Sequence, residues 1–214
     1  MESRFFTVSS KKNPLIKIDV AEGHFATGSA HISHYIDISD LKSGASRARG
    51  AARELAAPYL KNCDVDAIVC MEGTEIIAAY LAEEILTKSA GAAKPDKDIY
   101  VLTPMHSSNG NFIFHQNVQK RIFKKNIVIL VASMSTGSTV NRALECINYY
   151  GGKLTGISAI FSAFSEIGGR EVYSLFTEDD IDEYRFYSPS ECEMCHEGLK
   201  LDAIINSEGY TKIY

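Results

Sequence analysis

Residues 126–139 constrain the fold most strongly, because an apolar, β-branched segment runs directly into a small, hydroxyl-rich turn. This pattern predicts a buried strand, a turn and a helix start. Unpartnered N–H groups and the dipole at a helix start attract anions, and Gly137 lets the main chain approach a phosphate closely. The predicted phosphate-binding residues are Ser135, Thr136, Gly137, Ser138 and Thr139. The alternative is an ordinary helix start, capped by a hydroxyl side chain, that binds no ligand.

Strands and helices are predicted to alternate around this segment. Apolar spacing predicts helices over residues 41–60, 74–87 and 140–149, and strands over residues 67–71, 98–103 and 154–161. We expect Asp40 or Ser43 to cap the first of these helices. Strand–helix alternation at this spacing indicates parallel βαβ units, hence an α/β fold. Such sheets bind ligands outside the carboxyl ends of their strands, where the turn at Ser135 would lie.

The chain is long enough for one α/β domain with additions, although two small domains remain an alternative. Residues 1–40 mix short apolar runs with Gly, Ser and His and are expected to form an N-terminal hood or edge segment. Residues 41–190 form the predicted α/β core, which includes a connector at 89–97 and a polar excursion at 104–125. Residues 191–214 form a C-terminal tail that contains a Cys-x-x-Cys pair.

Composition excludes several classes of protein. A net charge of −5 and a pI near 5.7 argue against a general nucleic-acid binder. The N-terminus lacks the apolar stretch of a secretion signal, and no run of about 18 apolar residues suggests a membrane span. We therefore expect a cytoplasmic protein. An odd number of scattered cysteines fits a reducing compartment rather than a disulfide framework: Cys63, Cys70, Cys146, Cys192 and Cys195.

Four motifs resemble those of a type I phosphoribosyltransferase, most closely the orotate phosphoribosyltransferase branch. Ser135-Thr-Gly-Ser-Thr139 follows a strand as in the family's phosphate-binding motif, and residues 66–75 are similar to its first strand and pyrophosphate loop. Residues 33–37, Ser-His-Tyr-Ile-Asp, resemble a stretch ahead of the first helix in the orotate branch. Residues 192–198 resemble a Cys-x-x-Cys-x-x-Gly segment of some members of that branch. The resemblance spans roughly residues 33–198.

The resemblance implies a type I phosphoribosyltransferase fold: a central, mainly parallel sheet flanked by helices, with an N-terminal hood and a C-terminal tail. It implies transfer of a phosphoribosyl group from phosphoribosyl pyrophosphate (PRPP) to a nucleobase such as orotate, with Mg²⁺, in a homodimer. The implied ligand is a small phosphoribosyl compound or nucleotide, held by its 5′-phosphate at Ser135 to Thr139. The implied pyrophosphate loop consists of Glu72, Gly73, Thr74 and Glu75.

The sequence departs from the family at two places that matter for catalysis. Where the family has an acidic pair that holds the ribose hydroxyls, this chain has Val131-Ala132 or Ala132-Ser133. Where the orotate branch has a mobile loop of cations, residues 102–110 contain His106 as their one titratable group, which leaves His106 as a weak catalytic candidate. Loss of one donor aimed at developing charge typically costs on the order of 100- to 1,000-fold in rate.

Three functions therefore remain open: an active transferase, a catalytically degenerate nucleotide- or PRPP-binding sensor, and an interaction platform with no ligand. The lost carboxylates favour the sensor, and the retained order of loops favours the transferase. Four cations in the excursion would replace the missing ones if it folds over the site, although charge runs usually face solvent. These are Lys120, Arg121, Lys124 and Lys125.

Several candidates also have plain structural interpretations. Glu72 and Glu75 fit a helix's first turn, His106 fits a surface loop, and residues 178–183 fit a capped acidic turn after Thr177. Cys192 and Cys195 with the adjacent His196 supply at most three poorly placed zinc ligands. No metal site is therefore predicted, and packed thiols are the default, unless Cys63, Cys70 or a second subunit contributes a ligand. Base recognition is left to uncommitted side chains of the hood: His24, His31, His34 and Tyr35.

Overall fold

The structure is a computed structural model that describes residues 2–61, 64–89, 97–107, 110–206 and 209–213. Three features named from the sequence fall outside these ranges. They are Cys63, residues 90–96 of the connector, and residues 108–109 of the segment that corresponds to the mobile loop.

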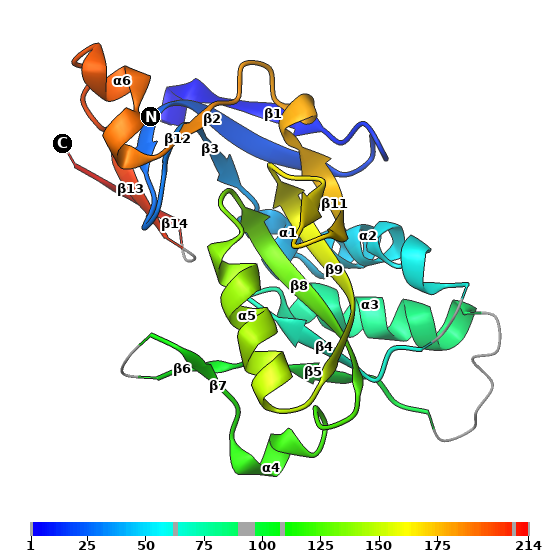
Figure 1. The fold of residues 1–214 in the computed structure, drawn as a ribbon. Coiled ribbons are helices and arrows are strands. Elements are labelled where there is room, and N and C mark those ends of the chain that lie inside the picture. The colour runs from blue at the N-terminus through cyan, green and yellow to red at the C-terminus, as the bar shows by residue number, and fades with distance from the viewer. Residues whose placement is uncertain (1, 62–63, 90–96, 108–109, 207–208, 214) are drawn as a thin grey trace.

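The core is a six-stranded sheet in the order β10-β11-β9-β8-β4-β5 (Figure 1). All of its strand pairs are parallel except the β10–β11 hairpin, so the predicted α/β fold with a mainly parallel sheet is confirmed. The strands are β4 (Ala67–Cys70), β5 (Tyr100–Leu102), β8 (Asn126–Met134), β9 (Lys153–Ser162), β10 (Glu166–Ile167) and β11 (Arg170–Thr177).

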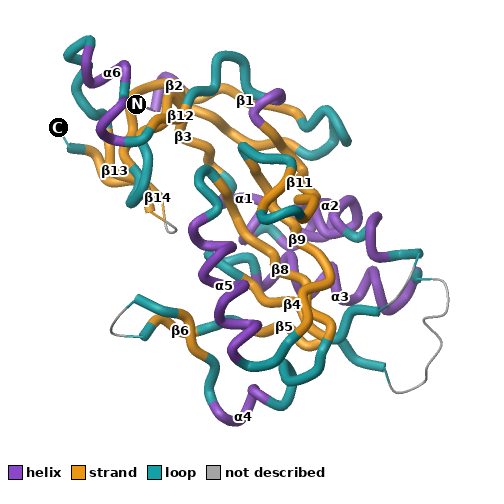
Figure 2. The backbone as a smooth tube through the Cα atoms, in the orientation of Figure 1, coloured by secondary structure: helices purple, strands orange, loops and turns teal. Residues whose placement is uncertain are grey.

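Helices cover both faces of this sheet, and alternate residues of β8 contact them. Val128 and Leu130 pack in one core with helices α2 (Ala45–Leu55) and α3 (Glu75–Lys88). Ile127 and Ile129 pack in a second core with α5 (Ser138–Tyr149). Because both faces of β8 are buried, its sequence is a continuous apolar run rather than an alternating one. Figure 2 shows α5 on the opposite side of the strands from α2 and α3.

The helix predicted over residues 41–60 is instead three short elements. They are α1 (Ser39–Ser43), α2 and the 3-10 turn η2 (Ala57–Tyr59). Gly44 separates α1 from α2 with an extended backbone, and a Cβ there would lie 2.8 Å from the carbonyl oxygen of Asp40. The predicted cap is also wrong, since neither helix has a side-chain cap hydrogen bond and Asp40 instead pairs with Arg47.

The remaining predicted elements of the core are confirmed within about two residues. The polar excursion forms a hairpin of β6 (Met105–His106) and β7 (Phe112–Ile113), followed by α4 (Gln116–Gln119). The acidic segment after β11 begins with η3 (Glu178–Asp180), where Thr177 and Asp180 form a capping box, as predicted. No helix in the described ranges combines the length and apolar character needed to cross a membrane.

The N-terminal hood and the C-terminal tail share a second sheet, here called the hood–tail sheet, with one short strand, β12, from the end of the segment predicted as core. Its order is β12-β3-β2-β13-β14, with β1 also paired to β2, and it lies beside the helix start of α5 (Figure 1). Its strands are β1 (Phe5–Ser9), β2 (Lys17–Ala26), β3 (His31–Asp37), β12 (Phe186–Tyr187), β13 (Ala203–Asn206) and β14 (Gly209–Lys212). Short helical turns complete the chain: η1 (Glu2–Arg4), η4 (Pro189–Glu191) and α6 (Glu193–His196).

Candidate functional site

The loop between β8 and α5 has the geometry that its sequence predicts. β8 ends at Met134, and Gly137 forms the N-cap of α5 in the left-handed conformation, with φ of 73°. The positive φ favours glycine here, and a Cβ at Gly137 would also lie 2.3 Å from Cδ1 of Ile167, which would have to move aside. The N–H groups of the first turn of α5 therefore face outward without intrahelical partners.

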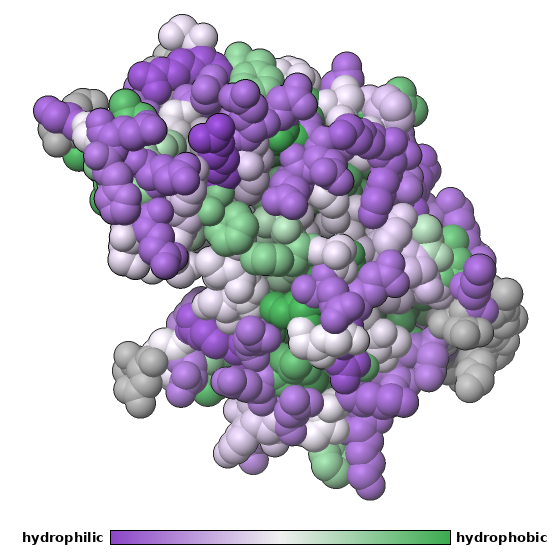
Figure 3. Space-filling model, turned by 45° about the horizontal axis from the view of Figure 1, so that its top comes forward, coloured by the Kyte–Doolittle hydropathy of each residue, from purple (hydrophilic) through white to green (hydrophobic). Residues whose placement is uncertain are grey.

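This loop forms one wall of a cavity of about 370 Å³ between the core and the hood–tail sheet. All five predicted phosphate-binding residues, Ser135 to Thr139, line it. Figure 3 shows the molecule hollowed between its two halves. The other lining residues include Thr27, Gly28, Ser29, Tyr35 and Ser39 from the hood, Lys42 and Arg142 from helices, Glu72 from the β4–α3 loop, and Ile205, Asn206 and Gly209 from the tail.

Glu72 places a carboxylate beside the phosphate loop. Its side chain accepts hydrogen bonds from the Ser133 N–H at 3.4 Å and from Oγ1 of Thr139 at 3.3 Å. Burial raises the pKa of Glu72 above 4.5, while these hydrogen bonds and the charge of Lys42 oppose the rise. Its backbone has a φ of 61°, which is unusual for a residue with a side chain. Residues in such backbone conformations are found most often at functional sites.

The other three predicted pyrophosphate-loop residues do not line the cavity. Gly73 has a φ of 78° and lets the chain turn into α3. Thr74 is fully buried and donates its hydroxyl to the Met71 carbonyl at 2.9 Å. Glu75 lies in the first turn of α3 and accepts a hydrogen bond from Oγ1 of Thr103 at 3.1 Å. For Glu75, the structural interpretation therefore fits better than a ligand role.

Two cations that the sequence analysis missed line the cavity. Arg142 follows Thr139 by three positions on α5, so the two side chains share one helix face. This spacing was a signal that the sequence offered. Lys42 arrives from α1 and donates to the carbonyl oxygen of Glu72 at 3.1 Å. Nothing in the sequence around Lys42 indicated that it would line a binding site.

The weaker cationic and histidine candidates lie elsewhere. His106 is exposed on the β6–β7 hairpin, where its ring packs edge-to-face on Phe112, and it does not line the cavity. Arg121 stacks on Tyr100, and Lys125 pairs with Asp66 at 3.7 Å. Lys120, Arg121, Lys124 and Lys125 are therefore absent from the cavity walls, as expected for a solvated face.

Of the four hood residues left for base recognition, Tyr35 is the one that lines the cavity. Burial raises its pKa to about 12, and its ring packs edge-to-face on that of Tyr210. His34 is buried and hydrogen-bonded to the Ser33 hydroxyl at 2.8 Å. His24 and His31 instead contact the cysteines of the tail.

These contacts correct one sequence-based expectation. Cys192 and Cys195 with His196 were expected to form no metal site unless Cys63, Cys70 or a second subunit contributed a ligand. Among the described residues, they instead group with His24 and His31, so that four ligand atoms lie within 4.8 Å of one another. Sequence reasoning missed the two histidines because β2 and β3 are more than 150 residues away from the tail.

Comparisons with known proteins identify the fold. An orotate phosphoribosyltransferase of Aeropyrum pernix matches with a TM-score of 0.51 and 19% identity, over 75% of this chain and 88% of that one. An orotate phosphoribosyltransferase of Mycobacterium tuberculosis H37Rv matches with a TM-score of 0.51 and 11% identity, over 75% and 93%. An adenine phosphoribosyltransferase of Leishmania tarentolae matches with a TM-score of 0.50 and 13% identity, over 71% of this chain and 80% of that one.

The chain therefore has the fold of the type I phosphoribosyltransferases. No family model matches the sequence, and no curated protein matches it. These structural neighbours are named as orotate phosphoribosyltransferases and as an adenine phosphoribosyltransferase. They therefore support the fold without selecting a branch of the family.

Proposed function

We propose that this protein binds a phosphoribosyl compound, a nucleotide or PRPP, by its 5′-phosphate at the β8–α5 loop. One observation carries the proposal: the start of α5, with Gly137 in the left-handed conformation, opens onto a cavity of about 370 Å³. Outward N–H groups at a helix start, with hydroxyls beside them, suit a phosphate monoester.

The charges in the cavity suit the rest of such a ligand. Lys42 and Arg142 offset the negative charge of phosphate groups, and Arg142 is the better suited to two-point contact with their oxygens. Glu72 offers a carboxylate that accepts hydrogen bonds, as ribose hydroxyls require. It reaches the end of β8 from the β4–α3 loop, next to Ser133, where the family carries its acidic pair. We infer that Glu72 takes over the ribose contact.

Transfer of the phosphoribosyl group to a nucleobase such as orotate is the second candidate function. The two cavity cations favour it, because departure of pyrophosphate needs positive charge near the leaving group. Against it, Glu72 is the single carboxylate among the described lining residues. Mg²⁺ is commonly held by one or two carboxylates together with substrate phosphates, so Glu72 would be its protein ligand here. We therefore expect binding with transfer that is very slow.

Isothermal titration calorimetry with ribose 5-phosphate, nucleoside monophosphates and PRPP, the last with and without Mg²⁺, tests the binding. We expect a saturable signal for at least one of them. Arg142→Gln should weaken it by about tenfold or more, since a charge-assisted hydrogen bond contributes about 1.5–3 kcal/mol. Arg121→Gln is the matched control, because Arg121 stacks on Tyr100 outside the cavity and should leave affinity unchanged.

The absence of binding by every one of these compounds would overturn the proposal. A pyrophosphate-release assay with orotate and with adenine separates the two functions. Rapid turnover with either base would establish the transferase. We also propose a homodimer, from the resemblance, and a cytoplasmic location, from the composition. Size-exclusion chromatography with light scattering tests the first, and cell fractionation tests the second.

A further inference from the structure

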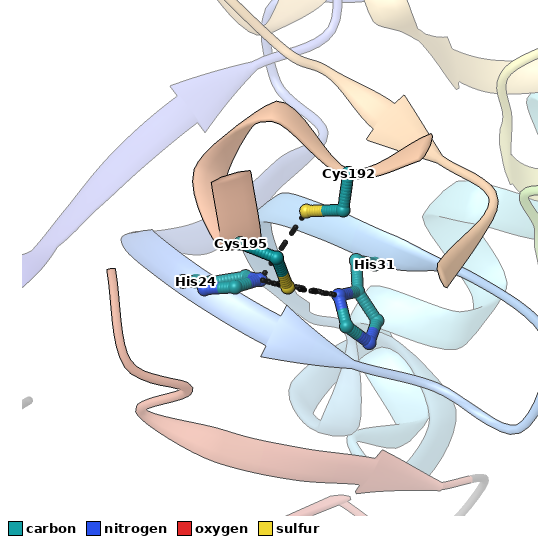
Figure 4. Close-up of side chains that lie close together, drawn as sticks. All are labelled: His24, His31, Cys192 and Cys195. Carbon is teal, nitrogen blue, oxygen red and sulfur yellow. Dashed lines mark hydrogen bonds between the residues drawn. The ribbon is translucent and has the colours of Figure 1, made fainter. Parts of the chain in front are cut away.

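A cluster of four side chains lies in the hood–tail sheet, away from the cavity. Figure 4 shows His24 and His31 from strands β2 and β3 facing Cys192 and Cys195 from the segment around α6. None of these four side chains lines the cavity. The proposed phosphoribosyl site therefore makes no use of them.

The spacing of the four ligand atoms fits a tetrahedral ion. Nε2 of His24 lies 3.4 Å from Sγ of Cys192, 3.6 Å from Sγ of Cys195 and 3.2 Å from Nδ1 of His31. Nδ1 of His31 lies 3.3 Å from Sγ of Cys195. Ligand atoms around tetrahedral zinc stand roughly 3.3–3.8 Å apart, given Zn–N bonds of about 2.0–2.1 Å and Zn–S bonds of about 2.3 Å. Four of the six pairs of ligand atoms, at 3.2–3.6 Å, are close to this spacing, and all six lie within 4.8 Å.

A hydrogen bond to the backbone prepares His24 as a ligand. Its Nδ1 lies 2.9 Å from the carbonyl oxygen of Leu199 and donates to it, which leaves Nε2 with a free lone pair directed at the cysteines. Metal-bound histidines almost always donate their second ring N–H in this way. The arrangement thus fixes both the tautomer and the direction of the ring.

The backbone of β2 places this histidine by an irregularity. In the pairing of β2 with β3, the register shifts between Glu22 and Phe25, so that β2 contains one more residue than its partner. Consecutive residues His24 and Phe25 are as a result both buried, with exposures of 3% and 0%. Bulges of this kind redirect a side chain that regular alternation would send elsewhere.

We propose that His24, His31, Cys192 and Cys195 bind one structural zinc ion in a closed Cys₂His₂ site. Two thiolates and two imidazoles are the donor set that zinc prefers, and four protein ligands leave no position for a substrate. The ion joins the β2–β3 hairpin to the tail. Both thiols lose their protons on binding, as a zinc thiolate requires.

Metal analysis of the purified protein tests the proposal. We expect one zinc per chain, and after removal by a chelator we expect saturable rebinding of Zn²⁺ and a raised melting temperature. Co²⁺ in its place should give the intense visible bands of a tetrahedral ion together with a thiolate charge-transfer band. A chain that neither retains zinc nor binds added Zn²⁺ or Co²⁺ overturns the proposal.

Single variants assign the ligands. Cys195→Ser is the most informative, because Cys195 is exposed and its replacement leaves the packed core intact. We expect it to lower zinc affinity by more than about 100-fold. Loss of a residue that only hydrogen-bonds to a metal ligand already costs about 10- to 100-fold in affinity, and loss of the ligand itself should cost more. His31→Gln should behave in the same way. Circular dichroism of both variants checks that they remain folded.

The matched control is His196→Gln, because His196 is next to Cys195 in α6 but outside the cluster. It should keep one zinc per chain and the cobalt spectrum. If Cys195→Ser holds zinc as tightly as the wild type, or if His196→Gln loses it, the assignment is wrong. Zinc content does not depend on phosphoribosyl binding, so failure of either proposal leaves the other testable.

Discussion

Replacement of Gly137 by alanine separates two reasons for which this position requires glycine. With φ of 73°, any side chain at position 137 adopts the left-handed region, which costs about 1–2 kcal/mol. The added Cβ would also lie 2.3 Å from Cδ1 of Ile167. Because Cδ1 is the end of a flexible side chain, it moves aside at a cost of about 0.5–1.5 kcal/mol. We therefore expect Gly137→Ala to destabilise the protein by about 1.5–3.5 kcal/mol.

Two further variants divide this cost. Gly169 has a φ of 75° and no atom within 4 Å of an added Cβ, so Gly169→Ala introduces the backbone strain alone. Ile167→Val removes Cδ1 and little else, so in combination with Gly137→Ala it should recover the steric part only. A change of 1 kcal/mol shifts the melting temperature by about 2–4 °C in a chain of this size. The expected losses are thus about 3–14 °C for Gly137→Ala and about 2–8 °C for Gly169→Ala.

Ligand affinity gives the decisive comparison. Alanine strains the left-handed conformation, so we expect the free loop of Gly137→Ala to relax from it. Binding must then restore it, and affinity for a 5′-phosphate should fall roughly 5- to 30-fold. Gly169→Ala should bind normally, because Gly169 lies in the β10–β11 turn outside the cavity. Equal affinities in calorimetry for Gly137→Ala and the wild type would refute the role given to this loop. Equal melting temperatures for the two alanine variants would refute the contact with Ile167.

Two other predictions concern stability. Because burial raises the pKa of Glu72 above 4.5, the folded state holds its proton more tightly than the unfolded chain, and stability falls as pH rises from 4.5 through the folded value. Glu72→Gln should therefore melt higher than the wild type near neutral pH, with a difference that shrinks below pH 4.5, and it should bind ribose phosphates more weakly. Thr177→Ala removes the capping box of η3 and should lower the stability by about 1 kcal/mol, or the melting temperature by about 2–4 °C. Ser188→Ala is the control, because Ser188 is an N-cap without a side-chain cap hydrogen bond, and it should keep the wild-type melting temperature. Equal melting curves for the two variants would contradict this prediction.

The core and the phosphate loop were predictable because their signals are local. The apolar run of β8, the hydroxyl-rich turn and Gly137 are contiguous, and β8, α5 and β9 form one parallel βαβ unit. The break at Gly44 was missed because a small residue between two helical patterns does not reveal whether the helix continues. Its close approach to the carbonyl of Asp40 decides this, and only the folded structure contains that contact.

The hood–tail sheet was not predictable, because its pairings join distant segments. Ala203 of β13 pairs with Phe25 of β2, and Phe186 of β12 pairs with Ile32 of β3. The strands involved are short or irregular, and no alternation in the sequence identifies their partners. The same distance hid the ligand cluster, since a Cys-x-x-Cys pair without its histidines indicates packed thiols as readily as a metal.

The tail links the two sites that the chain is proposed to carry. Ile205 and Asn206 of β13 line the cavity, while the same segment is tied to β2 by the Asp202 N–H, which donates to the carbonyl of His24 at 2.7 Å. A zinc ion that fixes His24 to the cysteines therefore also fixes the position of this cavity wall. The phosphate loop, by contrast, is the connection between β8 and α5 of the core. Loss of the metal should thus act on the part of the cavity that faces the ligand's ribose or base, and leave the phosphate contact in place.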